Sequence, residues 1–229
     1  MIDQPMRISL VIPTLNEGEG MLSLLHSLQP FRQSGHEVIL VDGDSADDSR
    51  DLAAPWVDRL IVVDRGRARQ MNTGAAAANG DLLWFLHADT VFSVGVMDAL
   101  QQLPLAPSPV WGRFDIRLSG QRKMLRVVEF MINLRSRLSG IATGDQGIFV
   151  HAELFREVGG FPDIPLMEDV ALSKRLKALS PPHCLGQHLV TSSRRWEQYG
   201  IFRTILLMWR LRLAYALGAD PSHLARLYH

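Results

Sequence analysis

The sequence predicts an α/β fold, with a mostly parallel sheet flanked by helices, and two observations support this. First, short apolar runs are nearly unbroken rather than alternating, as in strands buried on both faces of a parallel sheet. Second, segments with helical spacing of apolar residues separate these runs, which is typical of βαβ units. The predicted strands are Ile8–Ile12, Val38–Val41, Leu60–Val63 and Leu82–Leu86. The chain of 229 residues is long enough for one such domain.

Helices are predicted between and after these strands, where apolar residues recur every three or four positions. In the first part of the chain they cover 19–31, 45–54, 67–78 and 96–103. Beyond residue 94 the regular alternation of strands and helices ends. There the pattern predicts a linker over 104–109, an alternating strand over 111–118, a basic amphipathic helix over 122–138, a strand over 148–150, and helices over 152–158 and 170–179.

Composition narrows the class of protein. Lysine plus arginine equals aspartate plus glutamate, 24 each, so no overall charge favours a nucleic-acid partner. Cys184 is the single cysteine and has no partner for an internal disulfide, which fits a reducing compartment. No uncharged run approaches the roughly 18 residues of a membrane span, and the first residues read as the approach to a strand rather than a signal peptide. We therefore expect a cytoplasmic protein.

Polar side chains follow three of the predicted strands. The first strand leads into Pro13-Thr14-Leu15-Asn16-Glu17, the second into Asp42-Gly43-Asp44-Ser45, and the fourth into His87-Ala88-Asp89. Loops beyond the carboxyl ends of parallel strands form the binding crevice of open α/β sheets. Each acid could instead cap the helix that follows it. Three such strand ends in one chain favour a polar active site.

These motifs, in this order, resemble those of inverting family 2 glycosyltransferases with the GT-A fold. Residues 11–17 resemble the family's opening strand and turn, and residues 41–47 resemble its nucleotide-binding Val-Asp-Asp-Gly-Ser-x-Asp, with Gly43 and Asp44 in swapped order. His87-Ala88-Asp89 stands where the family has its metal motif, Asp-x-Asp. Gly159-Gly160-Phe161, followed by Glu168-Asp169, resembles the acceptor-side loop and catalytic acids. The matching stretches run from residue 8 to about residue 177.

The resemblance implies one GT-A domain over 1–229, a Rossmann-like fold of nucleotide-diphospho-sugar transferases. Its nucleotide-sugar-binding half would cover 1–105, its acceptor and catalytic half 106–190, and a C-terminal amphipathic helical segment 191–229. The implied reaction moves one sugar from a nucleotide-diphosphate sugar to a hydroxyl acceptor with inversion, UDP being the common nucleotide. The implied donor-binding residues are Pro13, Thr14, Asn16, Glu17, Asp42, Asp44, Arg67, Arg69, Asn72, His87 and Ala88. For the arginines and Asn72, a solvated helix face is an equal alternative.

Inverting transfer needs a general base, and the resemblance gives that role to Asp169, with Glu168 orienting it. Both acids could instead only favour the N-terminus of the following helix through its dipole. The resemblance also implies a divalent cation, Mn²⁺ or Mg²⁺, with Asp89 as the leading ligand and His87 as a second. Histidine suits magnesium poorly, so manganese is preferred. Asp89 could alternatively be a helix cap.

Residues of the second half are expected at the acceptor. Asp145 and Gln146 lie in a glycine-flanked turn, which is either a contact to sugar or acceptor or a plain tight turn. Processive relatives carry Gln-x-x-Arg-Trp, and here Ser192 stands in place of the glutamine before Arg195 and Trp196. The resemblance is therefore to the short, non-processive bacterial type, which adds one sugar. The acceptor would be lipid-linked or a small molecule.

The segment from Gly200 to Leu217 carries Arg203, Arg210 and Arg212 among apolar residues. Such a basic amphipathic helix lies on an anionic membrane surface, here the inner face of the membrane, or it packs on the core or on a second copy in a homodimer. Both alternatives stay open.

Three other functions are known for chains with related sheets or motifs, and each predicts a different sequence. A Rossmann oxidoreductase would carry Gly-x-Gly-x-x-Gly after the first strand, and this chain does not. A nucleotidyltransferase would carry a glycine-rich basic loop where the acidic residues 16–19 stand. An inactive sugar- or membrane-binding relative is suggested by His87, but the intact Glu168-Asp169 pair argues against it.

Overall fold

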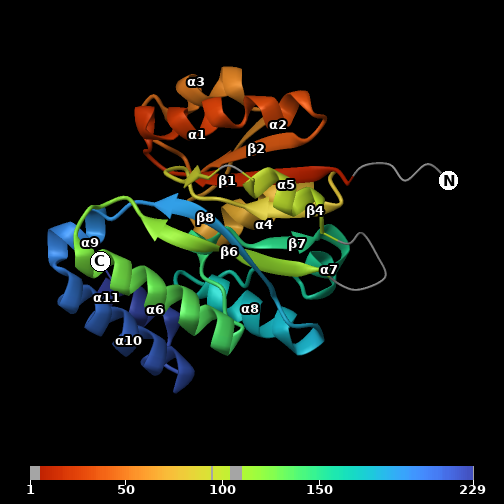
Figure 1. Ribbon diagram of the computed structural model, residues 1–229. Coiled ribbons are helices and arrows are strands. Elements are labelled where there is room, and N and C mark those ends of the chain that lie inside the picture. Colours follow the sequence, from red (N-terminus) through yellow and green to blue (C-terminus); the bar gives the residue numbers. More distant parts are fainter. Residues whose placement is uncertain (1–5, 94, 104–109, 229) are drawn as a thin grey trace.

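A computed structural model describes residues 6–93, 95–103 and 110–228. Within them, one sheet of eight strands runs in the order β3-β2-β1-β4-β7-β6-β8-β5 (Figure 1). Helices flank this sheet on both faces. The architecture confirms the predicted mixed, mostly parallel sheet with C-terminal helices.

The parallel part of the sheet comes from the first half of the chain. Its strands are β1 (Ile8–Thr14), β2 (Glu37–Asp42), β3 (Arg59–Val62) and β4 (Leu82–Phe85). In the register, Thr14 of β1 pairs with Asp42 of β2, so both strands end together. The loops that follow β1, β2 and β4 therefore lie at one edge of the sheet, as predicted.

Two of the predicted helices in this half differ from the structure. The segment expected as one helix over 19–31 consists of a 3-10 turn and two short helices, with Pro30 in the first turn of the second. These are η1 (Gly18–Met21), α1 (Leu22–Ser27) and α2 (Gln29–Gln33). The helix expected from residue 45 begins later because Ser45 belongs to the turn after β2. It comprises α3 (Ser49–Ala53) and η2 (Ala54–Trp56), and α4 (Arg67–Ala77) lies close to its predicted range.

The second half adds the remaining strands, β6 (Trp111–Leu118), β7 (Phe149–His151), β8 (His183–Thr191) and β5 (Val91–Phe92). β7 pairs antiparallel with β4 and β6, whereas β8 pairs parallel with β6. β5 and β8 were not predicted. β5 has two residues, and β8 is rich in polar and small residues, so neither gives an apolar run.

The other helices are α5 (Val96–Gln101), α6 (Lys123–Ser139), η3 (Gly144–Gln146), α7 (Ala152–Glu157), α8 (Glu168–Leu179), α9 (Arg194–Tyr199), α10 (Ile201–Ala216) and α11 (Pro221–Tyr228). Figure 1 places α1, α2 and α3 at one end of the molecule and α6, α10 and α11 at the opposite end. The predicted linker over 104–109, and with it the division near residue 105, lies outside the described residues. No helix of the described ranges combines the length and apolarity needed to cross a bilayer.

The core lies on both faces of the sheet. Ile8, Leu10 and Ile12 of β1 pack with α1 and α5 on one face, whereas Val11 packs with α4 and α8 on the other. This alternation along one buried strand explains the nearly continuous apolar run in the sequence. A separate cluster joins α6 to α10.

Candidate functional site

The turn after β2 is built around Asp42, the last residue of that strand. Asp42 is fully buried, and both of its oxygens accept hydrogen bonds from Ser45, Oδ1 from the backbone N–H (2.8 Å) and Oδ2 from the hydroxyl (2.5 Å). Gly43 N–H donates to the Thr14 carbonyl (2.8 Å), which links the turn to β1. Asp42 therefore shapes the turn, with its carboxylate held inside it.

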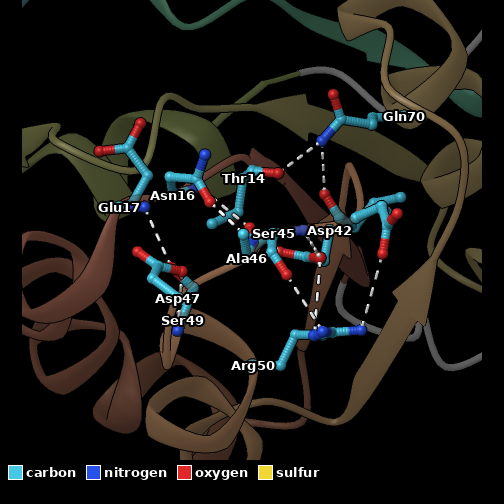
Figure 2. Close-up of polar contacts among 12 residues, drawn as sticks. Thr14, Asn16, Glu17, Asp42, Ser45, Ala46, Asp47, Ser49, Arg50 and Gln70 are labelled. Carbon is cyan, nitrogen blue, oxygen red and sulfur yellow. Dashed lines mark hydrogen bonds and ion pairs between the residues drawn. The ribbon is translucent and has the colours of Figure 1, made fainter.

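Asn16 joins the turn after β1 to the same loop. Its backbone is left-handed (φ 52°), its N–H donates to the Ser45 hydroxyl (2.9 Å), and its Oδ1 accepts from Ala46 N–H (2.9 Å). The hydroxyl of Ser49 accepts from the N–H groups of Glu17 and Gly18 (3.0 and 2.9 Å). Figure 2 shows that side chains of each loop hold the backbone of the other. The predicted donor edge is thus fixed before any ligand binds.

Gln70 of α4 completes this edge and was not predicted. Its buried amide Nε2 donates to the carbonyls of Thr14 (2.7 Å) and Val41 (2.9 Å), so one side chain ties β1 to β2. A Cβ at Gly43 would lie 3.0 Å from the same Nε2, which explains the glycine there. The only sequence signal was a polar residue between Ala68 and Met71, on the buried face of the predicted helix.

Other predicted donor residues differ in their surroundings. Pro13 is half-buried, and Thr14 is buried, with an Oγ1 that has no hydrogen-bond partner among the described residues. Asp44 is exposed, with left-handed backbone (φ 64°), and lies 3.9 Å from Arg50. Ala88 is buried beyond β4.

Arg69 and Asn72 make their polar contacts with the loop after α7. Arg69 pairs with Asp163 (3.1 Å), and the amide of Asn72 donates to the Phe161 carbonyl (2.7 Å) and accepts from its N–H (2.9 Å). These contacts anchor the glycine-rich loop of 159–163 to α4.

Carboxylates gather where β1 and β4 end. Desolvation raises the pKa of Glu17, and the charges of Asp89 and Asp47 raise it further, while Arg194 and Arg67 lower it. Asp89 is exposed at this rim. Among the described residues, no group of three or more His, Cys, Asp and Glu side chains is arranged as a complete metal site. The chain therefore offers Asp89, with Glu17 nearby, rather than a full set of ligands.

His87 faces Arg67. Its Nε2 contacts the Arg67 guanidinium, and burial together with that positive charge lowers the pKa of His87 well below its usual value. Neutral imidazole that accepts at Nε2 carries its proton on Nδ1, so no lone pair is left for a metal. With Arg67 in this place, Asp89 is the better metal ligand.

The acid pair opens α8. Asp169 accepts from Gly144 N–H at Oδ2 (2.8 Å) and from Val170 N–H at Oδ1 (2.6 Å), and these two hydrogen bonds fix the position of its carboxylate. Glu168 is buried, 3.5 Å from Nε of Arg67. Burial and the charge of Asp169 raise the pKa of Glu168 to about 7, against the opposing effect of Arg67. Two neighbouring carboxyls thus have different environments.

Arg67 connects the two parts of the site. It starts α4, contacts His87 after β4 and approaches Glu168 at the start of α8. A Cβ at Gly144 would lie 2.7 Å from its guanidinium, so the glycine leaves room for it. A cavity of about 10 Å³, which has room for one water at most, is lined by these residues and Asp169.

The turn of Asp145 and Gln146 lies beside the acid pair. Gln146 is fully buried, and its Oε1 accepts from Thr143 N–H (3.1 Å). Oδ1 of Asp145 and Nη2 of Arg135 are buried, each without a hydrogen-bond partner in the described part of the chain. Burial and the charge of Arg212 lower the pKa of Arg135 to about 10, while Asp145 and Asp169 oppose this shift. Arg135 and Arg212 therefore lie near the predicted base, and only the basic character of their helices hinted at them.

Arg195 and Trp196 pack among the C-terminal helices. The guanidinium of Arg195 donates to the Tyr228 carbonyl (2.5 Å) and lies over the Tyr228 ring, 3.7 Å from its centre. Trp196 packs against the cluster that joins α6 to α10. The charge of the neighbouring Arg194 lowers the pKa of Glu17, so Arg194 acts on the donor edge.

Comparisons with known proteins show the family of the chain. The profile of the family described as Glycosyl transferase family 2 matches residues 9–152. An uncharacterised glycosyltransferase of Mycobacterium tuberculosis is 31% identical over 169 residues, which cover 67% of this chain and 62% of that relative. A PGL/p-HBAD biosynthesis glycosyltransferase of Mycobacterium bovis is 39% identical over 88 residues, 35% of this chain and 34% of the relative. The chain thus spans about three fifths of the first relative's length.

Solved structures show the same fold. A mannosyltransferase from Pyrobaculum calidifontis, in complex with GDP-Man and Mn²⁺, matches 99% of this chain and 70% of its own, with a TM-score of 0.66 and 19% identity. Glucosyl-3-phosphoglycerate synthase from Mycobacterium tuberculosis, in complex with Mn²⁺, UDP and glucosyl-3-phosphoglycerate, matches 80% of this chain and 70% of its own, with a TM-score of 0.59 and 19% identity. The fold is GT-A, and the chain belongs to glycosyl transferase family 2.

Proposed function

We propose that the protein transfers one sugar from a nucleotide-diphosphate sugar to a hydroxyl acceptor, with inversion at the anomeric carbon. One observation carries this proposal: Arg67 contacts His87 at the donor edge and also approaches Glu168 of the acid pair. A group held at the donor edge would thus lie next to candidate general bases. An arginine at that junction suits the diphosphate of a nucleotide sugar.

The donor would bind over the linked turns after β1 and β2, with UDP as the favoured nucleotide. The unpartnered Thr14 hydroxyl supports a polar ligand there, because buried hydroxyls normally have partners. The fixed turns lower the entropic cost of ordering the site on binding. Two solved structures of the same fold hold GDP-Man and UDP, which supports a nucleotide-sugar donor.

A divalent cation, with manganese preferred, fits the rim beside Asp89. The mutual repulsion that raises the pKa of Glu17 would be relieved by a cation between these carboxylates. Asp89 would hold it, with diphosphate oxygens supplying the remaining ligands. When bound, the cation neutralises charge on the departing diphosphate. Both solved relatives contain Mn²⁺.

Asp169 would act as the general base. Its carboxylate accepts the proton of the acceptor hydroxyl as that oxygen bonds to the anomeric carbon, and the bond from this carbon to the diphosphate oxygen breaks. The N–H groups of Gly144 and Val170 hold the carboxylate in place. Glu168, with its raised pKa, would orient the acceptor or Asp169.

The acceptor would approach past the turn of Asp145 and Gln146. The unpartnered Asp145 oxygen supports a contact with a hydroxyl of the acceptor or of the donor sugar. Arg195 and Trp196 would border this side through the C-terminal helices that they hold. Ser192 in place of glutamine supports addition of a single sugar. The acceptor is either lipid-linked or a small molecule.

Thermal unfolding in the presence of UDP-, GDP- and dTDP-sugars, with and without Mn²⁺, tests the donor site. A donor at a hundred times its Kd should add about 2.7 kcal/mol to the free energy of unfolding. Asp89→Asn should remove the manganese-dependent part. Asp98→Asn, at an exposed acid of α5, is the matched control. No stabilisation by any of these sugars would contradict the proposal.

A further inference from the structure

Two neighbouring helices expose large apolar side chains along their outer faces. On α6 these are Met124, Val127, Phe130, Met131, Leu134 and Leu138, between 36% and 79% exposed. On α10 they are Phe202, Leu206, Trp209, Leu213 and Leu217, between 58% and 80% exposed. We name these two sets together the α6–α10 surface. Their spacing of three or four residues makes one continuous stripe on each helix.

The two stripes belong to one surface. Leu125 and Val128 of α6 pack with Ile201 of α10 in a shared cluster, and Ile205 packs against it. The exposed stripes lie on the sides of both helices that face away from the sheet core. Figure 1 shows α6 and α10 next to each other at the end of the molecule opposite α1. Soluble proteins rarely expose so many large apolar residues together.

The charges around the stripes are nearly all positive. On α10, Arg203 and Arg210 follow one side of the stripe and Arg212 the other, and this helix carries no acid. α6 carries Lys123, Arg126, Arg135 and Arg137 with one acid, Glu129, which is buried and pairs with Arg126 (3.0 Å). An apolar face flanked by arginines is typical of helices that lie in the interface of an anionic bilayer.

A groove of about 490 Å³ runs along the edge of the α6 stripe. It is lined by apolar Phe130 and Leu134, by Arg117, Arg126 and Arg137, and by the acids Asp115 and Glu129. The acids pair with Arg137 and Arg126, whereas Arg117 has no ion pair among the described residues. Arg117 thus adds a positive charge beside the apolar stripe, on the side of β6.

We propose that the α6–α10 surface docks on an anionic lipid bilayer, with its apolar stripes inserted among the lipids. A second copy of the chain is a poorer occupant, because a two-fold interface would bring this patch onto itself and face arginines with arginines. Docking does not depend on the proposed transfer reaction. It would place Arg135 of α6 and Arg212 of α10, which lie near Asp169, next to the membrane surface.

Flotation of the full chain with vesicles tests the proposal. We expect binding to vesicles of phosphatidylglycerol mixed with phosphatidylcholine, weakened by salt, and much weaker binding to phosphatidylcholine alone. Phe130→Glu with Trp209→Glu should lower binding by roughly tenfold or more, because two apolar insertions are lost. Val62→Glu with Leu179→Glu, at side chains 47% and 49% exposed elsewhere, is the matched control and should bind like the parent.

Fluorescence gives a second readout at the surface itself. Trp209 is 65% exposed, so its emission should shift to the blue on anionic vesicles, and Trp209→Phe should abolish that shift while vesicle binding persists. Equal vesicle binding by the double variant and its control, or no binding by the parent, would overturn the proposal. So would a dimer in light scattering that Phe130→Glu dissociates. Donor-induced thermal stabilisation, measured on the same variants, reports separately on the transfer site.

Discussion

The donor edge and the acid-pair side of the site differ in how their polar groups are satisfied. At the donor edge, Asp42 bonds Ser45, Asn16 bonds the next loop, and Gln70 bonds two strand carbonyls, while the Thr14 hydroxyl is the exception without a partner in the described residues. At the acid pair, Asp145 and Arg135 have buried atoms without hydrogen-bond partners in the described residues. Glu168 there has its pKa raised to about 7.

The donor edge thus has the features of a structural framework, and the acid pair has those of a chemically active site. A network that is already satisfied holds a fixed shape and loses stability when any member is removed. Groups held in unfavourable environments weaken the native state and are typical of places where a ligand or a proton transfer settles their charge. Substitutions at the donor edge should therefore reduce stability, whereas substitutions at the acid pair should reduce activity with less loss of stability, or with a gain.

The largest effect is expected from Asp169→Asn. Loss of the general base should lower kcat by about 10² to 10⁴-fold, because the acceptor hydroxyl then keeps its proton as it attacks. The asparagine oxygen can still accept one of the two backbone hydrogen bonds, so donor-induced thermal stabilisation should persist. Initial rates of sugar transfer at saturating donor measure the effect.

Asp98→Asn is the control for that substitution. Asp98 is an exposed acid of α5 and has no ion pair among the described residues. Its rate should stay near that of the parent. If Asp169→Asn transferred sugar at a near-normal rate and only Glu168→Gln abolished transfer, Glu168 would be the general base.

Glu168→Gln should change how stability depends on pH. The pKa of Glu168 rises from 4.5 to about 7 on folding, so between these values the native state holds more protons than the unfolded chain. The free energy of unfolding therefore falls as pH rises through this window, by at most about 3 kcal/mol. Glu168→Gln should remove that slope in urea titrations from pH 4.5 to 8. A slope as steep in this variant as in the parent would show that other groups cause it. Glu19→Gln, at an exposed acid, controls for the loss of one carboxyl.

The third effect is on the framework. Gln70→Met keeps the size of the side chain but leaves the Val41 carbonyl without its side-chain donor, which should cost about 1 to 3 kcal/mol. It should also weaken donor binding, since the turns after β1 and β2 lose their common anchor. Gln29→Met removes a similar bridge between the carbonyls of Leu25 and Trp56, away from the site. Equal losses of donor affinity in both variants would mean that the donor edge is not specially organised by Gln70.

The sequence predicted the framework well because its signals are local. Apolar runs identify strands buried on both faces, and residues after them must lie at one edge of a parallel sheet. β8 gave no such signal, because its polar and small residues form no apolar run. It forms a strand by pairing with β6. The break at Leu28 accompanies Pro30, which has no N–H to continue the helix. The late start of α3 depends on Ser45, which bonds Asp42 and, from the distant β1 turn, Asn16.

The chemistry at the acid pair was predicted less completely. The positions of Glu168 and Asp169 follow from a motif, but the pKa of Glu168 depends on burial that only the packed structure defines. The contact between Arg67 and His87 joins residues twenty positions apart, so the sequence did not show that an arginine lies against the ring nitrogen of this histidine. Arg135 lies ten residues before Asp145, and no spacing rule links a helix to the turn that follows it.

Arg135→Gln is therefore the most direct comparison of the two kinds of site, although its effect on stability is the smallest. Its charge is disfavoured by burial and by Arg212, and it is half-buried, so removing it should raise the free energy of unfolding by only up to about 1 kcal/mol. Arg113, fully buried and paired with Asp115, is the opposite case, and Arg113→Gln should cost about 3 to 5 kcal/mol. Urea unfolding of both variants measures the contrast, and sugar transfer by Arg135→Gln should fall because Asp169 and Asp145 lose the cation facing them. If Arg135→Gln were destabilised as strongly as Arg113→Gln, Arg135 would belong to the framework rather than to the site.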